Sequence, residues 1–84
     1  MVQSTLQISG QEREKWIRRN SYYYRCLVNH LKFTIPEGSS ILEIGCGTGF
    51  LLEQLSPKRG VGIDTSSSMI DYARQHRGQF TYFI

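Results

Sequence analysis

The chain has 84 residues, which is enough for one small domain at most and excludes a multi-domain enzyme. Hydrophobic residues make up 39% of the chain and charged residues 20%, a balance that favours a folded domain over a disordered one. Ten basic and seven acidic residues give a net charge of +3, which is too mild to indicate a nucleic-acid-binding protein by itself.

The first part of the chain is predicted to be a tail followed by helices. Residues 1–10 show no periodicity, and we expect a flexible tail there. Residues 11–35 are predicted to be a helical lead-in, because their apolar side chains recur at helical spacing (Ile17, Tyr24, Val28, Leu31, Ile35). Asn20 or Ser21 can cap a second helix inside this stretch. The turn residues at 36–38 end the lead-in.

After residue 36 the pattern changes to strands that alternate with helices. The short apolar run Ile41–Ile44 is typical of a strand that is buried on both faces. The expected elements that follow are a glycine-rich bend, a helix over 50–55, a strand over 61–63, a helix capped by Ser66 or Ser68, and a strand over 79–84. Such alternation implies parallel pairing through right-handed crossovers. The sequence therefore predicts an α/β fold.

The loop after the first strand, Gly45-Cys46-Gly47-Thr48-Gly49, carries the clearest functional signal. Glycines allow a tight bend and let a ligand approach the main chain, and the helix that follows offers free N–H groups. Asp64 ends the next strand, 19 residues after Gly45. A carboxylate at that place can accept hydrogen bonds from both hydroxyls of a ribose. These residues predict a site for a cofactor that carries a nucleoside.

The spacing of the glycines bears on which cofactor binds. A dinucleotide fingerprint, G-x-G-x-x-G, requires a third glycine where this chain has Phe50. This difference argues against an NAD(P)- or flavin-binding Rossmann fragment, which stays open as an alternative. A non-catalytic remnant of a truncated gene, which binds nothing usefully, is the other alternative.

At this point the sequence strongly resembles class I S-adenosylmethionine-dependent methyltransferases. Their first motif reads acid-x-Gly-x-Gly-x-Gly, and Ile41–Gly49 matches it without a departure, with Glu43 as the acid. Gly60–Asp64 and Ser66–Met69 resemble the second strand and the helix after it. The lead-in is similar to that of bacterial small-molecule methyltransferases, some of them fused to glycosyltransferases, at Asn20–Tyr24 and Ile35–Gly38.

The resemblance implies that the cofactor is S-adenosyl-L-methionine, and it suggests roles for individual residues. Those expected to contact the cofactor are Gly45, Gly47 and Gly49 with Cys46 and Thr48 in the same loop, Glu43 near the amino group, Asp64 on the ribose, and Thr65 and Met69 beside the adenine. Thr65 departs from the apolar residue that the family usually has there. Tyr22, Tyr23 and Tyr24 either cover the cofactor or, in the interpretation we favour, take part in amphipathic packing of the helix. No catalytic base and no metal ligand is predicted.

The resemblance also implies a Rossmann-like three-layer α/β/α sandwich, of which residues 36–84 would form only the first half. We expect this truncated half-domain to carry the cofactor motif and to lack the half that binds an unknown small-molecule acceptor. The first strand is central in the family's sheet and would lie at an edge here. Self-association through that edge is therefore expected.

The sequence also bears on macromolecular partners and on the cellular compartment of the protein. The basic residues from Arg13 to Arg25 can in principle contact RNA, DNA or anionic lipid, but a solvated helix face is the interpretation we favour, and a nucleic-acid partner is not expected. Two cysteines outside any C-x-x-C pattern form no disulfide framework. There is no secretory signal and no apolar run near the ~20 residues of a membrane span. We expect a cytoplasmic protein.

Overall fold

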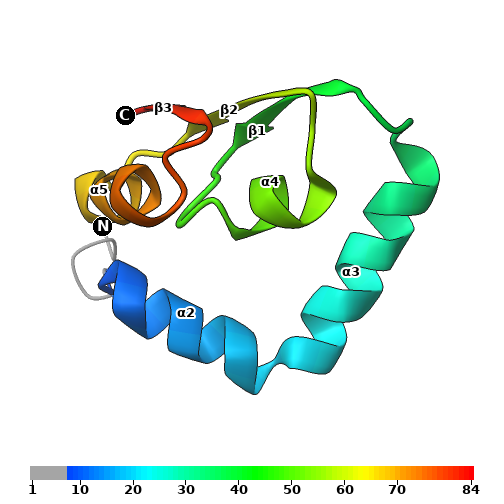
Figure 1. Ribbon diagram of the computed structural model, residues 1–84. Helices are drawn as coiled ribbons and strands as arrows, with labels where there is room; N and C mark the ends of the chain where they lie inside the picture. Colours follow the sequence, from blue (N-terminus) through cyan, green and yellow to red (C-terminus); the bar gives the residue numbers. More distant parts are fainter. Residues whose placement is uncertain (1–7) are drawn as a thin grey trace.

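A computed structural model describes residues 8–84, in which two helices precede a sheet of three strands (Figure 1). The elements in chain order are α2 (Gly10–Arg19), α3 (Ser21–Thr34), β1 (Ser40–Ile44), α4 (Phe50–Leu55), β2 (Arg59–Ile63), α5 (Ser67–His76) and β3 (Thr81–Phe83). The predicted order of helices and strands is confirmed. The first seven residues of the predicted tail lie outside the described residues.

The helix α2 begins at Gly10, one residue before the boundary predicted between the tail and the lead-in. Ser9 caps the helix, and its hydroxyl accepts a hydrogen bond from the Glu12 N–H at 3.1 Å. The Glu12 carboxylate in turn accepts from the Ser9 N–H at 3.1 Å, which completes a capping box. Gly10 is therefore the first residue of the helix, and Ser9 is its N-cap. The predicted break is confirmed, because Asn20 separates α2 from α3.

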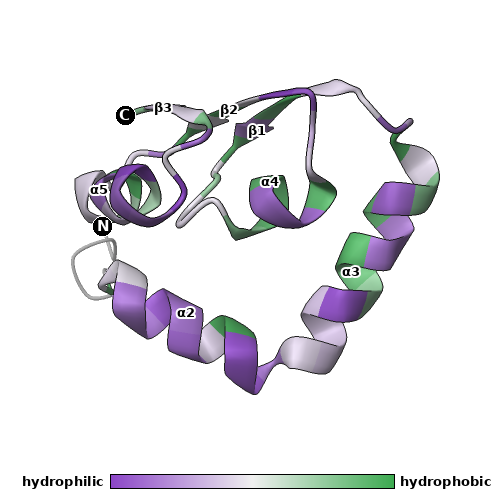
Figure 2. Cartoon of the chain, viewed as in Figure 1, coloured by the Kyte–Doolittle hydropathy of each residue, from purple (hydrophilic) through white to green (hydrophobic). Residues whose placement is uncertain are grey.

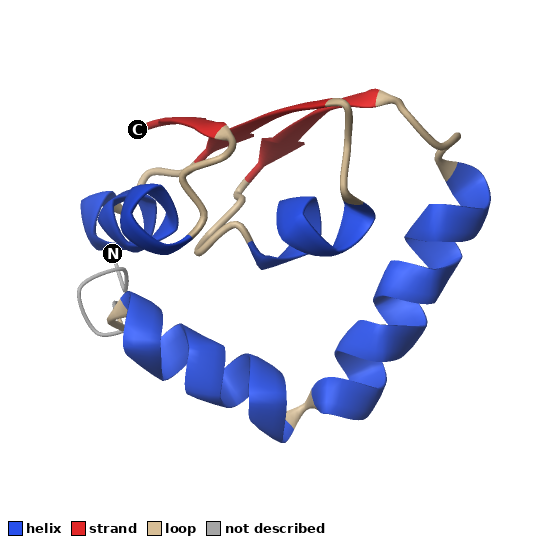
Figure 3. Cartoon of the chain, viewed as in Figure 1, coloured by secondary structure: helices blue, strands red, loops and turns tan. Residues whose placement is uncertain are grey.

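The three strands form a parallel sheet in the order β1-β2-β3. Figure 3 shows the helices of residues 8–84 on one side of this sheet. The core lies between the sheet and the helices α4 and α5, and its buried residues are Cys46, Leu52, Ile70, Ala73 and Tyr82. Gly62 brings β2 close to this core, since a Cβ there would lie 2.7 Å from the Cys46 Sγ. The α/β fold class is confirmed.

The opposite face of the sheet is open in the described part of the chain. Leu42 is 59% exposed, Ile44 79% and Phe83 52%. The prediction that Ile41–Ile44 is buried on both faces is therefore wrong for residues 8–84. The strands follow one another in sequence order, so crossovers of the same hand place both connecting helices on the same face.

A buried ion-pair network fastens α2 to the rest of the fold. The Arg77 guanidinium lies 2.9 Å from the Glu14 carboxylate of α2 and 3.1 Å from the Glu53 carboxylate of α4. It also donates to the Thr48 carbonyl at 3.0 Å. Gly10 adds a close contact, because a side chain at this position would collide with Tyr72 of α5. The lead-in is thereby held against the end of the glycine-rich loop.

Within residues 8–84, no helix combines the length and the apolar character that a bilayer span requires.

Candidate functional site

Asp64 joins the end of β2 to the glycine-rich loop, residues 45–49. Its Oδ2 accepts a hydrogen bond from the Gly47 N–H at 2.8 Å, and its Oδ1 accepts from the Ser66 N–H at 2.9 Å. The loop and the acid that the sequence singled out are therefore in direct contact. Each carboxylate oxygen still has a lone pair free, since an ionised carboxylate can accept about four hydrogen bonds.

The main chain at the start of the loop is also held by hydrogen bonds to the end of β2. The N–H groups of Gly45 and Cys46 both donate to the Ile63 carbonyl, at 2.7 and 3.0 Å. These bonds continue the pairing of β1 and β2 past the end of β1. The loop consequently begins at a defined place above the carboxyl ends of two parallel strands.

Two glycines of the loop serve different purposes. Both have positive φ angles, 55° at Gly47 and 82° at Gly49, which side chains rarely tolerate. A Cβ on Gly47 would meet only the Arg13 guanidinium, at 3.6 Å, so the space above it is open. A Cβ on Gly49 would lie 2.5 Å from the Tyr82 hydroxyl. Gly49 is thus required by packing, whereas Gly47 leaves room for a ligand.

A cavity of about 210 Å³ lies between the loop and the lead-in helices. Its lining comes from α2, α3, β1, the loop and α4, and the residues are Arg13, Ile17, Tyr23, Tyr24, Leu27, Glu43, Gly45, Cys46, Thr48, Phe50 and Leu51. Four of the predicted cofactor residues, Glu43, Gly45, Cys46 and Thr48, are among them. Of the three adjacent tyrosines, Tyr24 is half-buried and packs edge-on against Phe50, with ring centroids 5.7 Å apart.

Glu43 and Arg13 bring a carboxyl and a guanidinium into this cavity, and neither forms an ion pair within residues 8–84. The Glu43 Oε1 is buried and has no hydrogen-bond partner in the described part of the chain. Burial, and then the charge of Asp64, raise the pKa of Glu43 to about 7. Arg13 is half-buried and forms no ion pair within residues 8–84. The buried Glu43 carboxyl, once ionised, and the unpaired Arg13 cation in the same cavity complement the ammonium and carboxylate groups of an α-amino acid.

The pKa of Glu43 predicts how stability depends on pH. A glutamate in the unfolded chain titrates near its ordinary value of 4.5, so between pH 4.5 and about 7 only the folded chain keeps this proton. Stability should therefore fall as pH rises through that window. Glu43→Gln should remove this slope, while the exposed control Glu37→Gln should leave it unchanged. Urea unfolding at a series of pH values measures it, and a slope that persists in Glu43→Gln would assign the titration to another group.

Thr48 and Cys46 contribute to the structure of the loop. Thr48 is 1% exposed, and its hydroxyl donates to the Glu14 carboxylate at 2.5 Å. Burial acts to raise the pKa of Glu14, but hydrogen bonds from Arg77 and Thr48 and the Arg77 charge together hold it below its ordinary value. Burial raises the pKa of the Cys46 thiol to about 11, helped by the charges of Glu43 and Asp64. Cys46 is therefore protonated at neutral pH, which does not suit a nucleophile.

The remaining predicted residues lie outside the cavity. Thr65 is exposed, and Met69 is 4% exposed at the start of α5, where its N–H donates to the Ser66 hydroxyl. Sequence reasoning missed Arg13 and Glu14 as residues of the site. No local motif marks them, because only the packing of α2 brings them to the loop.

Comparisons with known proteins agree with this arrangement. A family model described as a methyltransferase domain matches residues 41–82. An uncharacterized protein of Methanocaldococcus jannaschii is 35% identical over 66 residues, which are 79% of this chain and 31% of that protein. The ubiquinone biosynthesis O-methyltransferase of Coxiella burnetii is 40% identical over 45 residues, which are 51% of this chain and 19% of the enzyme.

A solved structure shows the same fold. In the complex between the Haloferax volcanii Trm112 methyltransferase activator and a methyltransferase, one chain superimposes with a TM-score of 0.64 at 24% identity. The match covers 86% of this chain and 34% of that chain. This chain thus spans about a third or less of the length of each of these proteins. Because the family match extends from β1 through the glycine-rich loop to β3, the chain belongs to the class I S-adenosylmethionine-dependent methyltransferase family.

Proposed function

We propose that this chain binds S-adenosylmethionine and supplies the cofactor side of a methyltransferase site. The observation that carries the proposal is the buried Glu43 Oε1, which has no partner in the described residues and lines the same cavity as the unpaired Arg13. An α-amino acid group satisfies both at once. Such a group and a ribose occur together in S-adenosylmethionine, and Asp64, at the end of β2, is bonded to the Gly47 N–H of the loop, where it can receive the ribose.

Each residue has a role in this proposal. Glu43 accepts hydrogen bonds from the amino group of the cofactor, and Arg13 pairs with its carboxylate. Asp64 accepts hydrogen bonds from the ribose hydroxyls on the lone pairs that Gly47 and Ser66 leave free. The other residues proposed to border the cofactor are Gly45, Cys46, Gly47, Thr48 and Gly49 in the loop, and Thr65 and Met69 on the adenine side.

The bound cofactor supplies an activated methyl group. The residues of this chain hold it in place: Glu43 and Arg13 fix one end, Asp64 fixes the ribose, and Tyr24 and Phe50 close the cavity toward α3 and α4. Holding the donor in line with an acceptor and excluding water are the main contributions a protein makes to such a transfer. The name of the Coxiella relative specifies an O-methyltransferase, so we propose a hydroxyl of a small molecule as the acceptor.

We also propose that residues 8–84 form one wall of the site and that further elements complete it. The chain aligns with only about a third or less of the length of each similar protein, which supports this view. β1 is at the edge of the sheet, and its side chains Leu42 and Ile44 are exposed. By itself this fragment should therefore self-associate through that edge and transfer no methyl group.

Calorimetric titration tests cofactor binding in a protein that carries these 84 residues. S-adenosylhomocysteine should bind with a stoichiometry of one, and NAD should not bind. Glu43→Gln should weaken binding, while the exposed control Glu37→Gln should not. Binding of NAD in preference would support the dinucleotide alternative, and binding of neither ligand would support a remnant without cofactor function.

A further inference from the structure

The corner between α2 and α3 carries an unusual surface, which we call the corner surface and define as Lys15, Trp16, Arg19, Tyr22 and Tyr23. No acidic residue occurs anywhere from residue 15 to residue 36. Lys15 and Arg19 are exposed and form no ion pair within residues 8–84. The nearest acids along the chain are engaged, since Glu12 caps α2 and Glu14 pairs with Arg77. The positive charge of this surface is therefore not neutralised by the protein.

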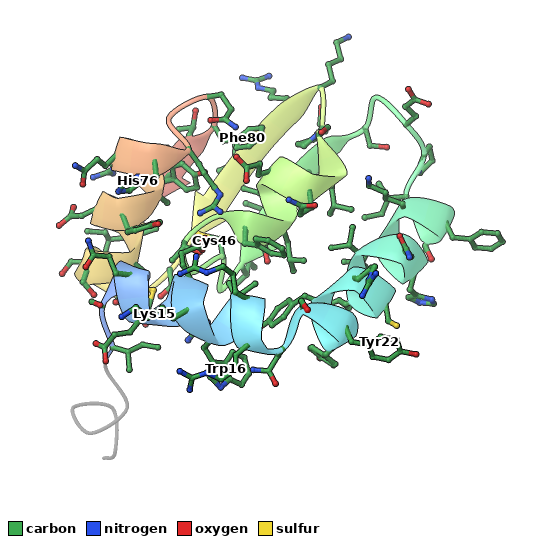
Figure 4. All side chains as sticks on the ribbon, turned by 60° about the horizontal axis from the view of Figure 1, so that its bottom comes forward. Lys15, Trp16, Tyr22, Cys46, His76 and Phe80 are labelled. Carbon is green, nitrogen blue, oxygen red and sulfur yellow. The ribbon has the colours of Figure 1, made fainter. Side chains whose placement is uncertain are left out.

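The same surface exposes large aromatic side chains. Trp16 is 49% exposed, Tyr22 74% and Tyr23 60%. Figure 4 shows Trp16 and Tyr22 at the lower edge of the molecule, on α2 and at the start of α3. The surroundings are polar, because Figure 2 shows α2 as mostly hydrophilic. Exposed aromatic rings among cations are unusual on a face that only contacts water.

Two of these rings, those of Trp16 and Tyr23, are also held in place. Tyr24 packs edge-on against both Trp16 and Tyr23, with ring centroids 6.0 and 5.2 Å apart. Tyr24 is itself fixed on Phe50 of α4. The corner therefore presents a preorganised surface, so that little side-chain entropy is lost when a partner binds.

We propose that the corner surface docks this protein on membranes that contain anionic phospholipids. Tryptophan and tyrosine favour the level of the lipid headgroups, where one part of the ring is apolar and another is hydrated. Lysine and arginine are attracted to anionic headgroups. Figure 1 places this corner at the end of the molecule remote from the sheet, where a flat partner can approach it. Single-stranded nucleic acids instead bind in basic grooves, and a convex corner does not provide one.

Trp16 is the sole tryptophan of the chain and reports directly on docking. The full chain is mixed with phosphatidylcholine vesicles that either contain or lack phosphatidylserine, and then floated through a density gradient. It should float only with the anionic vesicles, and the Trp16 emission should shift to shorter wavelength. About 0.5 M salt should release it, since screening then acts within a few Å. Flotation is used because self-associated protein sinks, so aggregation does not resemble binding.

A matched pair of charge variants tests the location. Each cation at an anionic surface contributes about fivefold to partitioning, so Lys15→Gln/Arg19→Gln should reduce it about 25-fold. Lys58→Gln/Arg59→Gln removes the same charge from exposed positions at the start of β2 and should reduce it much less. Circular dichroism checks that both variants fold.

Three results would overturn the proposal: no flotation, equal flotation with neutral and anionic vesicles, or equal losses in the two variant pairs. A labelled single-stranded RNA is tested in parallel, and binding to RNA without binding to vesicles would assign the surface to nucleic acid. None of these outcomes depends on cofactor binding, so this proposal and the proposed function can fail separately.

Discussion

Replacing Arg77 by methionine should lower the free energy of unfolding by about 3–5 kcal/mol, the usual cost of removing one partner from a buried ion pair. The side chains of Arg77 and Glu14 are only 9% and 12% exposed. Without the guanidinium, the Glu14 carboxylate would stay buried without its cation. Domains of this size have a total stability of about 4–13 kcal/mol, so the loss would be a large part of it. Denaturant unfolding monitored by circular dichroism measures the change.

Two further variants separate the ion pair from a general effect of losing an arginine. Arg19→Met removes an exposed arginine and should change stability by no more than about 0.5 kcal/mol. Glu14→Leu combined with Arg77→Met should recover much of the lost stability, because apolar replacements of a buried ion pair are often tolerated. If Arg77→Met were as mild as Arg19→Met, the network would not hold α2 to the loop.

Asp64→Ala should weaken the binding of S-adenosylhomocysteine by about 1.5–3 kcal/mol, the scale for hydrogen bonds to a charged acceptor. The substitution removes the proposed contacts to the ribose. It also removes the acceptor for the Gly47 N–H, so the loop loses a bond that fixes its shape. Asp71→Ala, an exposed acid on α5, is the matched control and should leave affinity unchanged. Affinity within twofold of the parent protein would remove Asp64 from the ribose role.

An analogue that lacks the ribose hydroxyls separates the two effects of Asp64. If Asp64 binds the ribose, the parent protein should prefer S-adenosylhomocysteine to its 2′,3′-dideoxy analogue, and Asp64→Ala should bind both alike. A preference that survives in Asp64→Ala would mean that the residue acts only through the shape of the loop. Calorimetry on the four combinations gives the coupling directly.

Local signals explain why the order of elements could be predicted. Ser66 caps α5 as one of the two serines expected, and the glycine-rich loop follows β1 as its motif requires. The exposure of Leu42 and Ile44 could not be predicted in the same way. An apolar run indicates that both faces of a strand suit burial, but whether the second face is covered depends on elements elsewhere in the protein.

Some residues of the candidate site could be predicted from the sequence and others could not. Gly47 and Asp64 belong to one motif, and the structure brings them within 2.8 Å of each other. Arg13 could not be predicted, since it reaches the cavity only through the docking of α2. That docking depends on the pairing of Glu14 with Arg77, which lie 63 residues apart in the chain. Contacts at such separation leave no pattern in a local stretch of sequence.

The most direct measurement is a crystal structure of the protein, in a form that binds cofactor, with S-adenosylhomocysteine. The ribose hydroxyls should lie within hydrogen-bond distance of the Asp64 carboxylate. The amino group of the ligand should reach the Glu43 Oε1, and its carboxylate should face Arg13. A ligand bound away from the glycine-rich loop, or one that leaves the Glu43 Oε1 without a polar partner, would contradict the proposed cofactor site.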